Sequence, residues 1–458
     1  MKKSLMIRLS VMMFLEFVIW GAWLPVAGLY FGGDLNFSGA QIGWLFALMP
    51  LMSIISPFIG GQMADRYVPT QIYLAFAHLI GGVCMLFLAP QSSFVAIVLL
   101  LGAWAFFYAP TLALVNSISF HHLENVQRDF GKIRFWGTLG WIVVGFGVTI
   151  WLSTAKFAKP EAVAGDAPAA QAVASQAVAS ADQPEDEGLL SKALAPPAKL
   201  LHSVASRILG RDPNPQLRDI FTIGGAASIL LGIFCFFLPH TPPSKKGGNP
   251  WAFLEAFKLC KDWHFIVFLL VSFMVGALLM IYFIWGSPFL VEIGVRTANV
   301  SSVLTLGQWA ELLTMALLPF ILPKLGMRKS LIVGLCSWPI LFGLFAASGA
   351  PMELQIAVVT LHGIGYGLFF TVSFIYVDSL AAKEIRASAQ ALQAVVLFGL
   401  GPFIGSKFAG WLKDAYTDGE AVAWSPIFLI PCVILAVCAV AFVLLFKQPQ
   451  ADAKEAGA

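Results

Sequence analysis

Long apolar runs, separated by short polar breaks, dominate the sequence. Each run holds roughly the 20 residues that an α-helix needs to cross a bilayer core about 30 Å thick. The runs predict twelve transmembrane helices, near residues 9–31, 41–64, 70–90, 94–118, 133–153, 220–239, 264–290, 301–322, 330–348, 354–377, 387–411 and 424–446. The breaks carry charge or turn-forming residues, as in the segments DRYVP (65–69) and PKLG (323–326). The pattern predicts an all-α integral membrane protein.

The composition excludes an ordinary soluble protein. Of the 458 residues, 59% are hydrophobic and only 12% are charged, and the mean hydropathy is +0.81. A soluble protein carries about 25% charged residues. The net charge of +3 is too balanced for a nucleic-acid binder. The six cysteines are scattered without CxxC spacing, so we expect no disulfide framework, no metal site and no cofactor.

The distribution of positive charge predicts the orientation in the membrane. If the N-terminus is cytoplasmic, the short cytoplasmic segments hold seventeen Lys and Arg residues, and the short external loops hold two, Arg296 and Lys413. Segments rich in Lys and Arg stay on the cytoplasmic side, so we expect both termini to be cytoplasmic. The first apolar run continues past residue 30 with Glu16 inside it, which favours a first span over a cleaved signal peptide.

The spans divide into two sets of six, which predicts two six-helix bundles around a central site. The expected units are 1–153 (N-terminal bundle, helices 1–5), 154–219 (external low-complexity loop), 220–240 (helix 6 of that bundle), 241–263 (cytoplasmic inter-bundle linker), 264–446 (C-terminal bundle, helices 7–12) and 447–458 (cytoplasmic tail). The loop 154–219 is too rich in Ala, Ser and Pro to bury a core, so we expect it to be largely disordered. Residues 189–210 within it have the spacing of a short amphipathic helix on the outer membrane face, which is either a docking element or a tolerated insertion.

Several strings indicate a family. The loop GGQMADR (60–66) resembles the Gly-x-x-x-Asp-Arg loop of the major facilitator superfamily. The strings FLEFVIWGAW (14–23), YAPTLALVNSISF (108–120), IRFWGTLG (133–140) and IRASAQ (385–390) resemble the nucleoside:proton symporter family of that superfamily. The resemblance covers the chain apart from loop 154–219. It implies a carrier, not an enzyme, that imports nucleosides by proton symport through alternating access. It also implies a monomer in the bacterial inner membrane whose partners are the nucleoside, protons and the lipid bilayer.

Ionisable side chains at membrane depth are costly, so each one is a candidate functional residue. Glu311 lies in the middle of a span, and Gln308 lies three residues earlier on the same helix face. A carboxyl group in a cavity of low dielectric constant takes up a proton more readily than one in water, as proton coupling requires. The resemblance implies that Gln308 and Glu311 contact the substrate. The alternative is a structural acid that hydrogen-bonds to a neighbouring helix.

Arg134 and Thr138 are four residues apart, which also places them on one helix face. The resemblance implies that this pair faces the cavity. The alternative for Arg134 is an arginine at a helix end that extends to the lipid headgroups. Lys407 leaves a similar choice between extending to the interface and contacting an anion or Glu311.

The sequence departs from the family pattern at several positions. Glu16 occupies a position where the family is expected to have an uncharged amide, so we predict either a second proton site or a partner of Arg134. Met280 and Phe283 are apolar where the family has polar cavity residues, and Gly367 follows Tyr366 where an acid is expected. These changes leave open another small polar solute, such as a sugar, as the alternative substrate.

Four further residues are candidates for substrate contact: Asn116, Gln393, Tyr366 and Trp20. The two amides have the donors and acceptors to contact a base edge or a sugar, and the alternative for them is hydrogen bonding between helices. We expect His78 and His362 to be core histidines. Asp65 and Arg66 are expected to cap helix ends and to pair across the cytoplasmic gate.

Overall fold

The computed structural model describes residues 3–157, 189–209, 212–243, 256–381 and 385–447, and nearly all of them are helical. The first half of the chain contains the following elements: α1 (Lys3–Leu29) with the π-helical turn η1 (Tyr30–Asp34), α2 (Gly39–Arg66), α3 (Thr70–Leu88), α4 (Phe94–Tyr108), α5 (Thr111–His122), α6 (Val126–Ser153) with η2 (Thr154–Phe157), α8 (Leu189–Leu209) and α9 (Asp219–Cys235).

The second half of the chain begins with the 3-10 turn η4 (Ala256–Lys261). It continues with α11 (Trp263–Glu292), η5 (Thr297–Asn299), α12 (Val300–Ala346), α13 (Met352–Ala357), α14 (Thr360–Gly365), the π-helical turn η6 (Tyr366–Phe370), α15 (Thr371–Leu380), α16 (Arg386–Ala394), the π-helical turn η7 (Val395–Leu400), α17 (Gly401–Ala415), β1 (Thr417–Asp418), β2 (Ala421–Val422) and α18 (Trp424–Leu445). The two short strands pair antiparallel, with Thr417 opposite Val422.

Ten helical stretches in the described residues are long and apolar enough to cross a membrane. Two of the expected spans, 301–322 and 330–348, lie in one of these stretches, Thr297–Ala346. Gly326 interrupts it with a φ of +74° and a ψ of 163°, a backbone conformation outside the helical range. The helix α9 is apolar but has only 17 residues. The structure thus confirms an all-helical membrane protein.

Local sequence explains where several helices begin and break. At the start of α2, the Ser38 hydroxyl accepts the backbone N–H of Gln41 (3.2 Å), and the Gln41 side chain accepts the backbone N–H of Ser38 (2.9 Å). This reciprocal capping satisfies two donors that a helix end leaves free. Pro110 separates α4 from α5, because proline has no N–H to donate within a helix.

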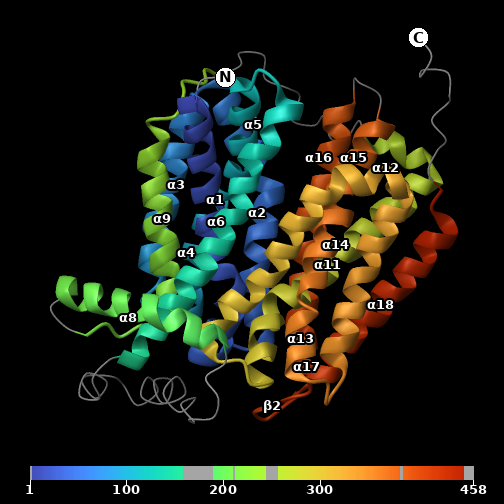
Figure 1. The fold of residues 1–458 in the computed structure, drawn as a ribbon. Helices are drawn as coiled ribbons and strands as arrows, with labels where there is room; N and C mark the ends of the chain where they lie inside the picture. Colours follow the sequence, from blue (N-terminus) through green and yellow to red (C-terminus); the bar gives the residue numbers. More distant parts are fainter. Residues whose placement is uncertain (1–2, 158–188, 210–211, 244–255, 382–384, 448–458) are drawn as a thin grey trace.

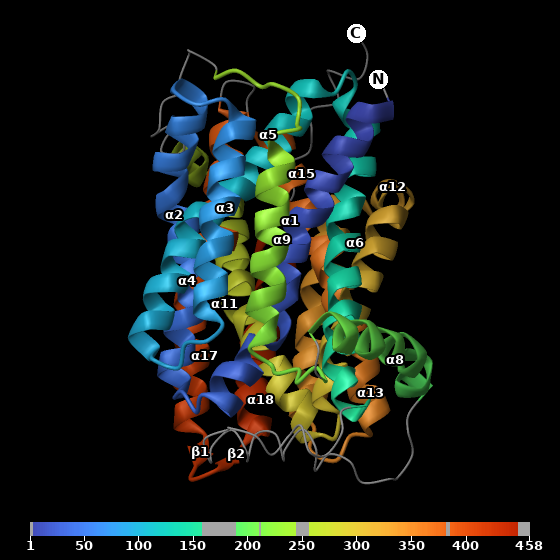
Figure 2. The ribbon, with the colours of Figure 1, turned by 90° about the vertical axis from the view of Figure 1, so that its left-hand side faces the viewer.

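The helices form two side-by-side groups, one from each half of the chain (Figure 1). The beginning of α1 and the end of α18 lie at the same end of the molecule, at the top of Figure 1. The β1–β2 hairpin and α8 lie at the opposite end, which we call the distal end. The helix expected over 189–210 is present as α8, and it runs across the direction of the long helices (Figure 2).

Candidate functional site

Glu311 lies where the two halves of the molecule meet. It belongs to α12 of the second half and is only 7% exposed. Its carboxyl group hydrogen-bonds with the Thr138 side chain and lies in the electrostatic field of Arg134, and both of these residues come from α6 of the first half. The helical spacing expected for Arg134 and Thr138 places both residues beside the same acid. The cluster therefore joins the two halves through one carboxyl group.

Arg134 is held between an aromatic ring and a hydroxyl group. Its guanidinium carbon lies 4.4 Å from the centroid of the Phe17 ring of α1, and its Nη1 lies 3.4 Å from the Thr138 hydroxyl oxygen as a long hydrogen bond. The side chain is half-buried. A cation over a ring face is attracted by the electrons of the ring. These contacts hold the guanidinium where its electrostatic field reaches Glu311.

Aromatic rings form a wall next to this cluster. Tyr366, at the start of η6, is close enough to Glu311 and Arg134 to interact with both electrostatically, and it stacks on Phe370 with ring centroids 4.3 Å apart. One helical turn earlier, His362 stacks on Tyr282 of α11 at 4.4 Å. Stacked rings of this kind present flat apolar surfaces beside a polar group.

Three buried polar atoms near this wall have no hydrogen-bond partner among the described residues. They are the Gln308 side-chain oxygen, the Tyr282 hydroxyl and Nδ1 of His362. Buried polar groups are nearly always paired, so an unpaired group calls for an explanation such as a bound molecule. Tyr282 was not among the residues predicted from the sequence, and His362 was predicted to be a core histidine. His362 lies four residues before Tyr366, so the two side chains share a helix face, and this spacing is the sequence signal that places His362 in the aromatic wall.

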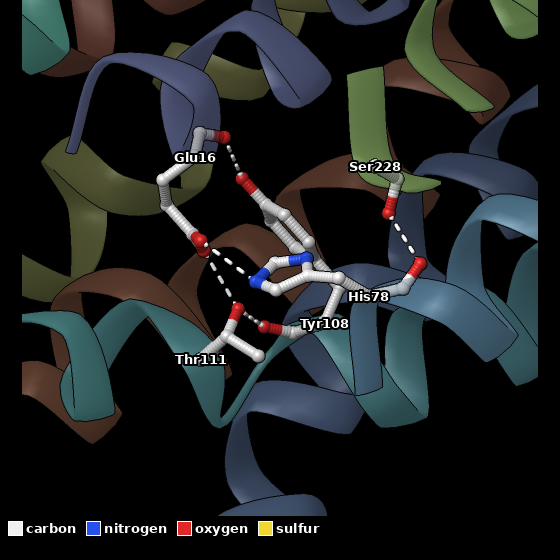
Figure 3. A network of polar contacts seen from close by, with 5 residues as sticks. All are labelled: Glu16, His78, Tyr108, Thr111 and Ser228. Atoms are coloured by element: carbon white, nitrogen blue, oxygen red, sulfur yellow. Dashed lines mark hydrogen bonds and ion pairs between the residues drawn. The ribbon is translucent and has the colours of Figure 1, made fainter. Parts of the chain in front are cut away.

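Glu16 lies in a second polar cluster, inside the first group of helices (Figure 3). Its side chain is 0% exposed, and its Oε2 lies 3.0 Å from Nε2 of His78 on α3. The Thr111 hydroxyl donates to Glu16 Oε1 (2.6 Å), and the Tyr108 hydroxyl donates to the backbone oxygen of Glu16 (2.7 Å). The partner of Glu16 is thus His78, whereas Arg134 lies beside Thr138 and Glu311.

The other candidate residues are spread over the two groups of helices. The Asn116 amide donates to the backbone oxygen of Leu112 within its own helix (3.0 Å). The Gln393 amide donates to the Ser272 hydroxyl (3.1 Å), which is an interhelical bond. The described contacts connect neither amide to Glu311. Trp20 packs edge-on against Tyr108 and Trp141, with centroids 6.3 and 5.7 Å apart.

The apolar substitutions also have defined positions. Met280 is buried, and the ring of Phe283 packs edge-on against His362 with centroids 5.3 Å apart. A side chain at Gly367 would meet Thr314, because a Cβ built there lies 2.7 Å from its methyl carbon. Gly367, which stands where the family pattern has an acid, therefore allows α12 to pack closely against this part of the cluster.

Three charged residues remain from the sequence predictions: Asp65 and Arg66 at a helix end, and Lys407 within α17. Asp65 and Arg66 are the last two residues of α2, and their side chains lie outside the described part of the structure. The Lys407 ammonium nitrogen lies 3.1 Å from the centroid of the Trp44 ring of α2. Lys407 thus forms a cation–π contact between the two groups of helices, a partner that the sequence analysis did not foresee.

The two groups of helices are also joined at the distal end. Asp414, at the end of α17, accepts hydrogen bonds from the backbone N–H groups of Gly39 (2.6 Å) and Ala40 (2.7 Å) at the start of α2. A carboxylate at a helix N-terminus satisfies free N–H groups and interacts favourably with the helix dipole. The backbones approach closely here, since a Cβ built on Gly410 would lie 2.2 Å from the Gly39 oxygen.

Comparisons with known proteins agree with this architecture. The family model described as Nucleoside H+ symporter matches residues 2–164 and 207–451. The chain is 31% identical to the putative nucleoside transporter YegT of Escherichia coli (strain K12), over 96% of this chain and 93% of that protein. It is 27% identical to the nucleoside permease NupG of the same organism, over 97% of this chain and 96% of that protein.

Solved structures share the fold. A crystal structure of the nucleoside transporter NupG superposes with a TM-score of 0.77 at 25% identity, covering 97% of this chain and 100% of that one. A crystal structure of a D-xylose-proton symporter has a TM-score of 0.68 at 12% identity, covering 98% of this chain and 99% of that one, and this likeness concerns the fold alone. The fold is that of a major facilitator transporter, and the chain belongs to the nucleoside H+ symporter family.

Proposed function

We propose that this protein imports nucleosides together with protons by alternating access, with Glu311 as the proton-coupling carboxyl group. The single observation that carries the proposal is that the Glu311 carboxyl group of one half hydrogen-bonds with Thr138 and lies in the electrostatic field of Arg134, both from the other half. Addition of a proton to Glu311 removes the charge that Arg134 balances. The interaction of Glu311 with Arg134 therefore holds the two halves together while Glu311 is deprotonated, and it weakens when Glu311 binds a proton.

The proposal gives each polar group of this cluster a role. Gln308 and Thr138 offer hydrogen-bonding groups to the hydroxyls or the base edge of a nucleoside, and Arg134 offers N–H donors to an oxygen. The aromatic wall at Tyr366 and the ring of Trp20 offer flat surfaces on which a base can stack. Asn116 and Gln393 each keep an unpaired buried side-chain oxygen, so we assign them to the same substrate space as further acceptors.

We further propose the topology that the charge distribution predicts. The break at Gly326 divides α12 into two spans, and α9 supplies another, which together with the remaining helices gives twelve spans. An even number of spans is supported by the common end at which α1 begins and α18 ends (Figure 1). That end is cytoplasmic, with Asp65 and Arg66 at its gate, and the distal end is external. The carrier lies in the bacterial inner membrane as a monomer.

Uptake of labelled uridine into proteoliposomes tests the proposed function. We expect uptake to rise above equilibrium when an inward proton gradient is imposed, and to fall to simple equilibration when a protonophore dissipates the gradient. Absence of uridine uptake by well-folded protein contradicts the nucleoside assignment and directs the search to other small polar solutes. Uptake that does not respond to the gradient contradicts proton coupling.

The Asp414 contact predicts a measurable shift in the gating equilibrium. Asp414→Ala should favour the state that is open to the outside, because the mutation removes two hydrogen bonds that exist only while the distal end is closed. Hydrogen bonds to charged groups contribute about 1.5–3 kcal/mol when buried, and partial exposure of Asp414 reduces the expected shift to a few-fold. The measurement is the labelling rate of a cysteine introduced at Ser406, which is 0% exposed and lies beside Gly43, so that a membrane-impermeant reagent added outside reaches it only in the open state.

Asp418→Ala is the matched control for this prediction. Asp418 is an exposed acid of the β1–β2 hairpin, four residues from Asp414. Asp418→Ala should leave the labelling rate of the cysteine at Ser406 unchanged. Equal labelling rates in the Asp414 variant and the control contradict a role of this contact in closing the distal end.

A further inference from the structure

We propose that Glu16 and His78 form a second proton-binding site, which releases and takes up one proton in each transport cycle in addition to the proton of Glu311. The inference rests on the proposed function, since it adds a second proton to the same symport. It concerns a cluster that lies inside the N-terminal half and is separate from the contact between the halves (Figure 3).

Glu16 is a buried acid that is not paired with a permanently charged cation among the described residues. Glu16 is 0% exposed and His78 is 1% exposed. Among the described residues, the ion-pair partner of the Glu16 carboxyl group is His78, and no Lys or Arg side chain is paired with it. An isolated charge in such a place is costly. The pair is electrically neutral only when it holds one proton, either on the carboxyl oxygen or on the imidazole.

The Glu311 cluster has the opposite charge balance. Glu311 faces Arg134, which stays protonated at all physiological pH values. The Glu311–Arg134 pair is therefore neutral when Glu311 has lost its proton, whereas the Glu16–His78 pair is neutral when its proton is bound. The two sites thus respond differently to loss of a proton, so the second site is not a duplicate of the first.

The imidazole ring of His78 is not fixed in one tautomer by hydrogen bonds among the described residues. Structural histidines usually donate or accept through both ring nitrogens, which fixes their tautomer. Nδ1 of His78 is buried and has no partner among the described residues. Nε2 lies 3.0 Å from Glu16 Oε2 as an ion-pair contact without hydrogen-bond geometry, so no described hydrogen bond fixes which ring nitrogen carries the proton. Histidine with an unfixed ring is suited to pass a proton at physiological pH.

The surroundings stabilise the pair in both states. The Thr111 hydroxyl of α5 lies 2.6 Å from both Glu16 Oε1 and the Tyr108 backbone oxygen, so it can donate to a Glu16 carboxylate, or donate to the Tyr108 oxygen and accept from a protonated Glu16. The Ser228 hydroxyl of α9 donates to the backbone oxygen of His78 (2.8 Å). The other titratable groups that face Glu16 are Tyr108 of α4 and Cys235 of α9. Both are normally neutral at physiological pH. Of the two arginines of α6, Arg134 lies over the Phe17 ring and Arg128 pairs with Asp129.

An aromatic cover separates the pair from the substrate space. Tyr108 packs edge-on against both His78 (6.0 Å) and Trp20 (6.3 Å), and Trp20 lies one helical turn after Glu16. Trp20 is half-buried, whereas Tyr108 is fully buried. When the distal end is closed and a base stacked on Trp20 leaves toward the cytoplasm, this cover opens and the proton shared between Oε2 and Nε2 passes to cytoplasmic water. It leaves a carboxylate and a neutral imidazole behind, and the next proton from the external side restores the neutral pair.

The test is the number of protons transported per nucleoside. It is obtained in proteoliposomes from the membrane potential at which a fixed uridine gradient and a fixed pH gradient produce no net flux. Glu16→Gln should transport one proton fewer per nucleoside than the wild type, while uridine exchange between equal concentrations continues. Glu353→Gln, an exposed acid at the start of α13, is the matched control and should keep the wild-type number.

The outcomes separate this inference from the proposed function. A wild-type carrier without any proton coupling overturns both. A coupled wild type with the same number of protons in Glu16→Gln and in His78→Gln overturns only the second site, and shows that the pair is structural. If these two variants do not fold, Thr111→Val decides, since valine keeps the shape of the side chain and removes the hydroxyl that lies 2.6 Å from Glu16 Oε1 and from the Tyr108 backbone oxygen. The pH of half-maximal uptake should then move upward, and an unchanged pH profile overturns the inference.

Discussion

Glu311→Gln is expected to abolish concentrative uptake while the protein stays folded. Glutamine keeps the size and the hydrogen-bonding capacity of the side chain but cannot bind and release a proton. One proton crossing a potential of about 100 mV supplies about 2.3 kcal/mol, enough to concentrate a solute roughly 50-fold. The variant should therefore bring labelled uridine only to equal concentrations inside and outside, whatever proton gradient is applied.

Two controls make this result specific. Glu353→Gln should accumulate uridine as the wild type does. Exchange of labelled for unlabelled uridine should persist in Glu311→Gln, because exchange needs no net proton movement. Gradient-driven accumulation by Glu311→Gln would remove the carboxyl group from the coupling mechanism and leave Glu311 as a structural acid.

Arg134→Gln is expected to have the second large effect, on both uptake and stability. It leaves the buried Glu311 carboxylate without the positive charge whose electrostatic field acts on it, and a buried charge without compensation is destabilising. Because Arg134 is half-buried, we expect a loss nearer the 1.5–3 kcal/mol of a hydrogen bond to a charged group. Uridine uptake should fall in parallel. The measurements are the thermal unfolding midpoint in detergent and the initial uptake rate.

A double-mutant cycle distinguishes an interaction with Glu311 from a local effect of Arg134. In Arg134→Gln/Glu311→Gln the acid is neutral and no longer needs a cation, so the double variant should regain most of the unfolding midpoint lost in Arg134→Gln. Uptake against a gradient should not return. Strictly additive losses of stability would contradict the proposed pairing of the two side chains.

The positions of Gln308, Glu311, Arg134 and Thr138 follow from local rules. Residues three or four apart share a helix face, and an ionisable group at membrane depth is rarely incidental. The sequence thus predicted that each pair acts together on its own helix. It left open whether Arg134 turns to the lipid headgroups or inward. The structure places Arg134 beside Glu311, a residue of the other half of the chain.

Glu16 shows the opposite case. Its cost at membrane depth is visible in the sequence, but its partner is not, because a helix in the membrane packs on several neighbours and the order of packing is not a local property. The alternatives from the sequence were a proton site or a pairing with Arg134. The structure pairs it with His78, which the sequence analysis had assigned to the core. The contact of Asp414 with Gly39, 375 residues apart, was equally out of reach.

The sequence by itself determined that this chain is a helical membrane protein, which segments are apolar enough to span the bilayer, and which family it resembles. In lipid, a backbone must satisfy its own hydrogen bonds, so an apolar run of sufficient length has little choice but to form a helix. Only the tertiary structure decided which buried charges meet, because those contacts depend on how helices from distant parts of the chain pack together. The chemistry proposed for Glu311, and for Glu16 with His78, depends on that packing.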